Sequence, residues 1–228
     1  MAVEVSCWIP ILRSKRLVLA GDDCQLAPTI ISKEAADKGL GRTLFQRVRE
    51  EHGEEVMRML TVQYRMHEDI SDWSSGAMYG GRLVPADGVR RRTLLELPGV
   101  KETAETSSVL VVIDTDGCGM EEEQDEKGSS RNEGEALVVQ EHLERLLAAG
   151  VQEESIGVLA PYNGQVAVLR DRLKEKYRGV EIGTVDGFQG REKDALLLSL
   201  VRSNTRREVG FLSDDRRLNV AITRAKSH

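Results

Sequence analysis

Cysteine is scarce in this chain. Of 228 residues only Cys7, Cys24 and Cys118 are cysteines, and they stand far apart. They form neither a disulfide framework nor the closely spaced pairs of a zinc site. The four histidines are scattered as well, so we expect no metal site. Unpaired thiols predict a reducing compartment, and the expected location is therefore the nucleus or the cytoplasm.

Long apolar runs are also missing. No stretch approaches the ~20 residues that a membrane-spanning helix needs. The first residues lack the basic region and apolar core of a secretory signal. Hydrophobic residues make up 40% of the chain and charged residues 31%, which is typical of a globular protein large enough for one or two domains. We therefore expect a folded core and no membrane partner.

Two motifs of ATP binding are absent. The phosphate loop G-x-x-x-x-G-K-S/T, whose backbone cradles a triphosphate, does not occur. The only Asp-Glu pair, Asp125-Glu126, lies in an acidic stretch and does not follow an apolar strand. It is therefore no candidate for the carboxylate that holds Mg²⁺ in such enzymes. The chain alone is predicted to be catalytically inactive.

The net charge of −6 argues against a nucleic-acid partner, but the charge is unevenly distributed. Negative charge is concentrated in 119–132, which we predict to be a mobile acidic loop. Local field, rather than net charge, decides whether a polyanion is attracted. For Arg90 to Arg92 a solvated face is the favoured interpretation. Basic residues gather at 90–92, at Arg202, Arg206 and Arg207, and at Arg216, Arg217, Arg224 and Lys226.

Apolar runs and amphipathic segments alternate along the chain. This alternation predicts βαβ units, and hence an α/β fold with a parallel β-sheet flanked by helices. The predicted strands are 15–20, 109–113, 155–160, 181–185 and 195–201. The predicted helices are 44–58, 68–78, 133–149, 166–176 and 214–226.

The polar stretch from Gln63 to His67 is the main candidate site. Arg65 offers a planar fork of donors that suits phosphate oxygens, and Tyr64 offers a flat ring that can stack on a nucleobase. A helix is predicted to start directly afterwards, and a helix N-terminus favours anions.

Loops that follow predicted strands supply further candidates, because ligands of open α/β sheets bind at the carboxyl ends of strands. Gln25 follows the strand at 15–20. Pro161, Tyr162 and Asn163 follow the strand at 155–160, and the backbone N–H groups of such a loop can hold a phosphate backbone without reading sequence. Packing inside the fold is an equally weighted interpretation of Tyr162.

Four blocks, in this order, resemble the later motifs of superfamily 1 helicases. The resemblance is to the Upf1-like branch, and within it to the immunoglobulin mu-binding protein 2 type, and it covers nearly the whole chain. Residues 7–12 and 209–219 also read like that group. The four blocks are Gly21 to Pro28, Val62 to His67, Val185 to Glu192 and Val220 to Lys226.

The resemblance implies a RecA-like, P-loop NTPase fold that is incomplete at both ends. Residues 1–60 would be the tail of the first RecA-like domain. Residues 61–228 would be the second, helicase C-terminal (AAA-type) domain. The parent would be an ATP-dependent helicase that moves 5′ to 3′ on single-stranded DNA or RNA. ATP would lie between the two domains, and the ligands of Mg²⁺ would come from the missing upstream part.

The resemblance also implies roles for residues. Gln25 would sense the γ-phosphate, and Arg65 and Arg224 would be arginine fingers. Contacts to a single strand would come from Pro161, Tyr162, Asn163 and Thr184. The complete ATP-binding set would be Gln25, Tyr64, Arg65, Gly190, Glu192 and Arg224.

Two alternatives to the motor remain open from the sequence. One is a non-catalytic module that binds nucleic acid or a protein and carries vestigial ATP residues. The other is a globular fragment with no independent role. Residue types do not discriminate DNA from RNA. Contacts to a sugar-phosphate backbone are independent of base sequence, and the sequence does not identify the residues that would contact a 2′-hydroxyl.

Overall fold

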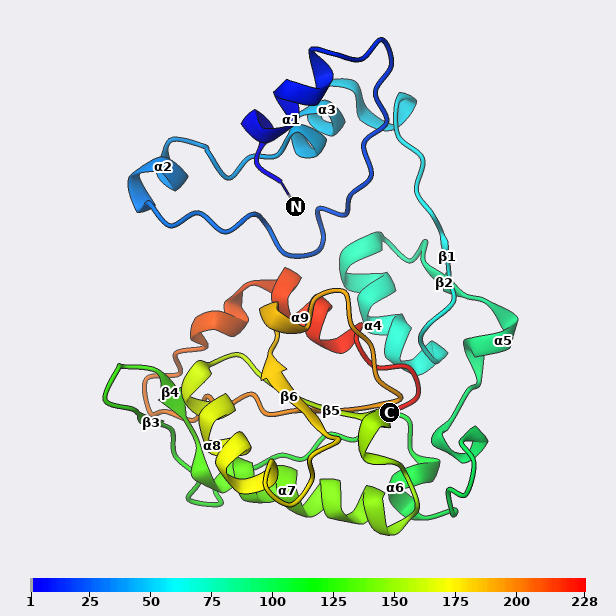
Figure 1. Ribbon diagram of the computed structural model, residues 1–228, viewed down its shortest axis with the longest axis vertical. Helices are drawn as coiled ribbons and strands as arrows, with labels where there is room; N and C mark the ends of the chain where they lie inside the picture. The colour runs from blue at the N-terminus through cyan, green and yellow to red at the C-terminus, as the bar shows by residue number, and fades with distance from the viewer. Residues whose placement is uncertain (1) are drawn as a thin grey trace. The chain divides into compact units, whose positions relative to one another are not determined.

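The computed structural model describes residues 2–228 (Figure 1). The chain divides into two compact units between Leu60 and Thr61. The first unit consists of the helices α1 (Glu4–Ile11), α2 (Lys33–Asp37) and α3 (Leu44–His52) and the 3₁₀ turn η1 (Gly53–Glu55). The Thr43 hydroxyl accepts a hydrogen bond from the Gln46 N–H and begins α3, and Arg47 ties this helix to Glu4 of α1 at 2.9 Å.

The prediction of a strand at 15–20 is wrong. These residues are irregular, and Val18 is 93% exposed. A strand needs a neighbour to satisfy its backbone N–H and C=O groups, and the described part of the first unit contains no strand. Helix α3 is also shorter than the predicted 44–58, because the chain turns at Gly53 with φ +61°.

The second unit is built on a three-stranded parallel sheet in the order β6-β5-β7, which confirms the α/β prediction. The strands are β5 (Ile156–Ala160), β6 (Glu181–Thr184) and β7 (Ala195–Leu198). Val158 of the central strand faces Ile182 on one side and Leu197 on the other. All five residues of β5 are buried, because a parallel sheet is covered on both faces.

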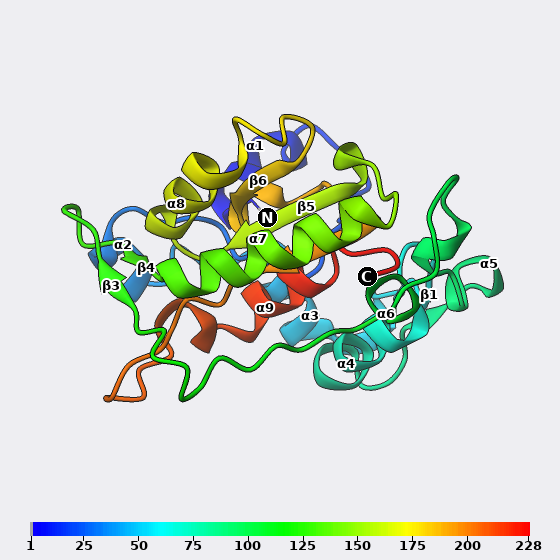
Figure 2. The ribbon, with the colours of Figure 1, turned by 90° about the horizontal axis from the view of Figure 1, so that it is seen from below.

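Two helices cover one face of this sheet. They are α7 (Glu133–Ala148) and α8 (Asn163–Leu173), which lie side by side in Figures 1 and 2. Helix α7 presents a stripe at helical spacing to the core: Ala136, Val139, Leu143 and Leu146 are all buried. On the other face Leu196 of β7 and Ile222 of α9 (Asp215–Ile222) pack against an apolar cluster that includes Ile70 of α4 (Glu68–Tyr79).

The remaining elements are short. A parallel pair of strands precedes the sheet, a hairpin precedes α7, and helical turns join the rest. Among residues 2–228 no helix is both long and apolar enough to cross a membrane. These elements are β1 (Val62–Gln63), β2 (Val84–Pro85), α5 (Asp87–Arg90), η2 (Leu94–Glu96), α6 (Ala104–Ser107), β3 (Glu123–Gln124), β4 (Ser130–Arg131), η3 (Glu153–Ser155), η4 (Asp186–Phe188) and η5 (Gly210–Ser213).

The prediction of a strand at 109–113 is wrong for the same reason as that at 15–20. Val109 packs into the core, but Leu110 and Val112 are 62% and 83% exposed. No strand of the described residues pairs with this segment. Its β-branched composition fits a pleated surface, yet composition cannot supply the neighbouring strand.

The acidic segment 119–132 differs from the mobile loop that we expected. It forms the antiparallel hairpin β3–β4, and its ends are held by hydrogen bonds. Asn132, which is fully buried, caps α7 through the Glu135 N–H at 3.0 Å and donates to the Met120 carbonyl at 2.9 Å. The buried amide of Gln165 on α8 bonds both the N–H and the C=O of Asn132.

Replacing Asn132 by alanine should therefore destabilise the second unit. The substitution removes an N-cap and leaves buried backbone groups without partners, at a cost of about 2–3 kcal/mol. At about 2–4 °C per kcal/mol for a domain of this size, calorimetry should find the melting temperature lower by roughly 4–12 °C. Gln124→Ala, at an exposed position of the same hairpin, is the matched control. Equal melting of the two variants would contradict the anchoring role.

Candidate functional site

The turn that follows β1 is held together by one side chain. The Gln63 amide oxygen accepts hydrogen bonds from the N–H groups of Arg65 and Met66 at 2.7 and 2.8 Å, and its amide nitrogen donates to the Met66 carbonyl. Met66 is buried, whereas Tyr64 is 76% exposed. The sequence thus folds here so that one side chain anchors the turn and the Tyr64 ring faces solvent.

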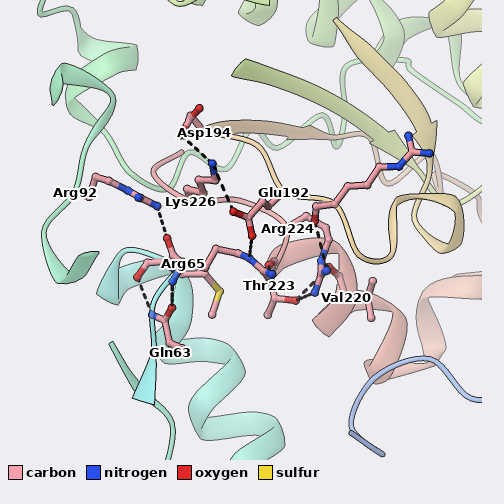
Figure 3. Close-up of polar contacts among 11 residues, drawn as sticks. Gln63, Arg65, Arg92, Glu192, Asp194, Val220, Thr223, Arg224 and Lys226 are labelled. Carbon is pink, nitrogen blue, oxygen red and sulfur yellow. Dashed lines mark hydrogen bonds and ion pairs between the residues drawn. The ribbon is translucent and has the colours of Figure 1, made fainter. Parts of the chain in front are cut away.

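The guanidinium of Arg65 joins this turn to the distant end of the chain (Figure 3). Its Nε donates to the Glu192 carboxylate at 2.5 Å, and its Nη1 donates to the Thr223 carbonyl at 2.9 Å. Arg92 donates in turn to the Arg65 carbonyl. Among residues 2–228 the hydrogen bonds of the Arg65 guanidinium use Nε and Nη1, and the side chain is 32% exposed.

Glu192 is held between two cations. Besides Arg65, the Lys226 ammonium lies 3.6 Å from the Glu192 carboxylate and 3.6 Å from that of Asp194. Partial burial raises the pKa of Glu192, but the hydrogen bond and charge of Arg65, helped by Lys226, outweigh it and lower the pKa below its ordinary value. Glu192 is therefore ionised at neutral pH and neutralises part of the local positive charge.

Arg224 belongs to the same cluster but points inward. Its exposed fraction is 3%. Its Nε donates to the Val220 carbonyl and its Nη2 to the Thr223 hydroxyl, both at 3.0 Å, and Nη1 lies 3.5 Å from the Arg191 carbonyl. Thr223 thus contacts both arginines, through its carbonyl and its hydroxyl. Helix α9 ends at Ile222, so the predicted helix at 214–226 is too long and Arg224 lies beyond the helix itself.

Gly190 and Gln25 are the remaining members of the predicted ATP-binding set. Gly190 adopts φ +85°, a left-handed conformation that favours glycine, in the turn directly before Arg191 and Glu192. Gln25 lies in the first unit, where its side chain donates to the Asp22 carboxylate at 2.7 Å.

The carboxyl ends of β5 and β6 form a second part of the site. Asn163 at the start of α8 and Thr184 at the end of β6 line one open cavity of about 210 Å³. Phe188 and Ile182 contribute its apolar wall, and Arg170 and Arg191 contribute cations. The structure therefore places two residues of the predicted strand-contacting set, Asn163 and Thr184, around one cavity.

Neighbouring groups fix the polar residues of this cavity. The Thr184 hydroxyl accepts a hydrogen bond from the Gly187 N–H at 3.1 Å. Arg191 pairs with Glu181, and Arg170 donates to the Ile182 carbonyl at 2.9 Å. Of the loop residues predicted from the sequence, Pro161 is buried, Tyr162 partly buried and Asn163 exposed. Asn163 is thus the member of that loop best placed to meet a ligand.

Sequence reasoning missed several of these residues. Arg92, which we interpreted as part of a solvated face, contacts the backbone of Arg65. Arg170 was one charge among many on a helix, and only the fold shows that it reaches the cavity. Arg191 lies within the block from Val185 to Glu192, but only Gly190 and Glu192 of that block were predicted to bind ATP.

Neither part of the site gathers the ligands of a metal ion. Within the described residues, the only group of at least three potential ligands is Asp22, Asp23 and Cys24 of the first unit. Asp23 is already paired with Arg49, and Asp22 accepts from Gln25. The second unit instead offers fixed cations, an exposed aromatic ring and an apolar-walled cavity, which suit phosphate groups and a nucleoside.

The chain matches known proteins over its whole length. Residues 40–228 match a family model described as "AAA domain", and residues 1–33 match a second model with that description. The DNA-binding protein SMUBP-2 of Rattus norvegicus is 52% identical over all of this chain and 23% of its own length. DNA polymerase alpha-associated DNA helicase A of Schizosaccharomyces pombe is 46% identical, over 100% of this chain and 34% of its own length.

A more distant relative extends the pattern. The regulator of nonsense transcripts 1 homolog of Drosophila melanogaster is 41% identical over 99% of this chain and 19% of its own length. The chain thus spans about a third or less of each of these relatives. The matches confirm the resemblance drawn from the four motifs: the chain belongs to the AAA domain family, among the Upf1-like superfamily 1 helicases.

Proposed function

We propose that the second unit is the nucleic-acid-binding half of an ATP-driven motor. The longer protein would be an ATP-dependent helicase or translocase that moves 5′ to 3′ on single-stranded DNA or RNA in the nucleus or cytoplasm. The observation that carries the proposal is the meeting of Arg65 and Arg224 at Thr223, which lies 158 positions from Arg65. The names of two relatives mention DNA.

ATP fits the donor set around Arg65. Tyr64 would contact the base or ribose, Glu192 would hold the ribose side, and the turn at Gly190 would allow a close backbone approach. ATP when bound supplies the free energy of phosphoryl transfer. Arg65 and Arg224 would stabilise the negative charge that spreads over phosphate oxygens in the transition state. Gln25 and the Mg²⁺ ligands would belong to the preceding RecA-like domain, the expected partner of this one.

The single strand of nucleic acid would bind at the cavity lined by α8, β6 and the loop that follows β6. Thr184 and the loop from Pro161 to Asn163 would contact its backbone, with Arg170 and Arg191 close by. Arg191 and Glu192 are adjacent, and one faces the cavity while the other pairs with Arg65. This adjacency supports a mechanism in which a movement of the Arg65–Glu192 pair on ATP binding also moves Arg191 at the cavity that would bind the nucleic-acid strand.

A second candidate function is a non-catalytic module that binds nucleic acid. The inward orientation of Arg224 favours it, because a guanidinium that is 3% exposed and bonded to Val220 and Thr223 would have to rearrange before it met a phosphate. The two candidates differ in whether Arg65 and Arg224 affect turnover.

A chimera tests the motor directly. This chain replaces the matching segment of the rat relative, which supplies the remaining upstream sequence. Arg65→Ala should lower the rate of strand-stimulated ATP hydrolysis by about 100-fold or more, since an arginine finger contributes roughly 10³–10⁵ in enzymes that use one. Arg65→Lys should rescue poorly, because an ammonium lacks the planar fork. Arg224→Ala should also lower turnover, and its buried bonds predict a lower melting temperature as well.

Controls separate the outcomes. The unfused 228-residue chain should show no ATP hydrolysis above background. Arg91→Ala, at an exposed arginine near the site, should leave turnover and melting unchanged. Full turnover in Arg65→Ala would rule out the finger role, and an effect of Arg224→Ala on melting alone would make that residue structural. Loss of turnover with near-normal melting and nucleotide affinity in Arg65→Ala supports the motor.

A further inference from the structure

Arg202 lies over the Tyr162 ring at the carboxyl end of the central strand. Its guanidinium carbon is 5.9 Å from the ring centroid, and its Nη1 is 3.3 Å from the Tyr162 hydroxyl. Tyr162 directly precedes Asn163, which begins α8 and lines the cavity. Tyr162 is therefore the single residue that connects Arg202 with Asn163 at the rim of the cavity.

The charge of Arg202 is already neutralised. Its Nε lies 2.8 Å from the Glu122 carboxylate, and both side chains are only about 15% exposed, at 15% and 14%. The same carboxylate accepts hydrogen bonds from the Ser203 N–H at 2.9 Å and from Asn204 at 3.3 Å. A cation held in this way is a poor attractor of phosphate, since its field is cancelled locally. The role of Arg202 must therefore be to position its neighbour Tyr162.

The backbone before Arg202 is strained. Val201 adopts φ +73° although it is β-branched and fully buried, a conformation that persists only when surrounding contacts enforce it. Glu135 accepts from the Val201 N–H at 2.9 Å, and Asn132 donates to the Val201 carbonyl at 3.3 Å. The fold thus holds an unfavourable turn directly before the residue that reaches Tyr162.

The segment after Arg202 closes over the pair. A Cβ atom on Gly210 would lie 2.4 Å from Nη1 of Arg202 and 2.6 Å from the Tyr162 hydroxyl, and Gly210 has φ +59°. A side chain at this position would displace the ends of the Arg202 and Tyr162 side chains, and the positive φ also favours glycine. Arg202 is enclosed by the Glu122 carboxylate, the Tyr162 ring and the Gly210 backbone.

We propose that Arg202 is a positioning residue for single-stranded nucleic acid. It fixes the Tyr162–Asn163 turn at the mouth of the cavity, and so makes strand binding depend on the acidic hairpin through Glu122. The inference rests on the proposed strand-binding function. It adds that a residue without strand contact of its own determines the affinity.

Binding of a fluorescein-labelled 15-mer of deoxythymidine to the 228-residue chain, followed by anisotropy, tests this inference. Arg202→Lys keeps the charge and the ion pair with Glu122, and so the fold, but loses the planar group above the ring. We expect binding to weaken by about tenfold, as for one lost charge-assisted hydrogen bond. The control Arg206→Met, at an arginine 83% exposed on the same segment, should not reproduce this loss.

Two readouts separate positioning from a general structural role. Tyr162→Ala should weaken binding similarly, and Arg202→Lys combined with Tyr162→Ala should be no weaker than Tyr162→Ala alone. The salt dependence of Arg202→Met should keep the wild-type slope, whereas loss of a direct phosphate contact would reduce the slope by about one. Three results would overturn this inference without touching the proposed strand site. They are wild-type affinity in Arg202→Lys, a double variant whose loss of affinity is the product of the two single losses, and a reduced salt slope in Arg202→Met. No binding by the wild type would overturn the proposed strand site as well.

Discussion

The ion pair between Arg65 and Glu192 is the interaction on which the rest of the site depends. It spans 127 positions of sequence at 2.5 Å and fixes the turn after β1 against the loop after β6. Its energetic contribution is modest, since both groups are partly exposed, at 32% and 42%, and exposed pairs are worth about 1 kcal/mol or less. Its importance is geometric, because it holds the Arg65 guanidinium of the turn after β1 against the loop that carries Gly190 and Glu192.

A second constraint comes from buried polar groups around α7 and α8. The amide of Gln165 is fully buried, and it bonds the Asn132 backbone and the Ser199 hydroxyl. Glu135 accepts from Ser199 at 2.6 Å and from the N–H of Val201. This network is expensive to break, because each buried group left unpaired costs about 1–3 kcal/mol. It links the hairpin, the sheet and the turn at Val201 through buried hydrogen bonds.

Much of the second unit was predictable from the sequence, and the failures share a physical cause. Helix α7 and the strands β5 to β7 follow from periodicity, because their neighbours lie within the chain. The segments at 15–20 and 109–113 have the composition of strands but no pairing partner in residues 2–228, and periodicity cannot reveal that. The motifs nominated Arg65 and Thr184, yet only the fold shows that Arg224 faces inward and that Arg92 and Arg170 approach the site.

Hydrogen exchange of the chimera tests the central claim most directly. The claim is that Tyr64 to His67 and Gly190 to Glu192 form one nucleotide-responsive surface. Adding ADP with aluminium fluoride, which resembles the phosphoryl transition state, should slow amide exchange in both segments together and leave the exposed hairpin tip near Lys127 unchanged. Slowed exchange in the upstream part of the relative, with unaltered exchange in both segments, would contradict the account.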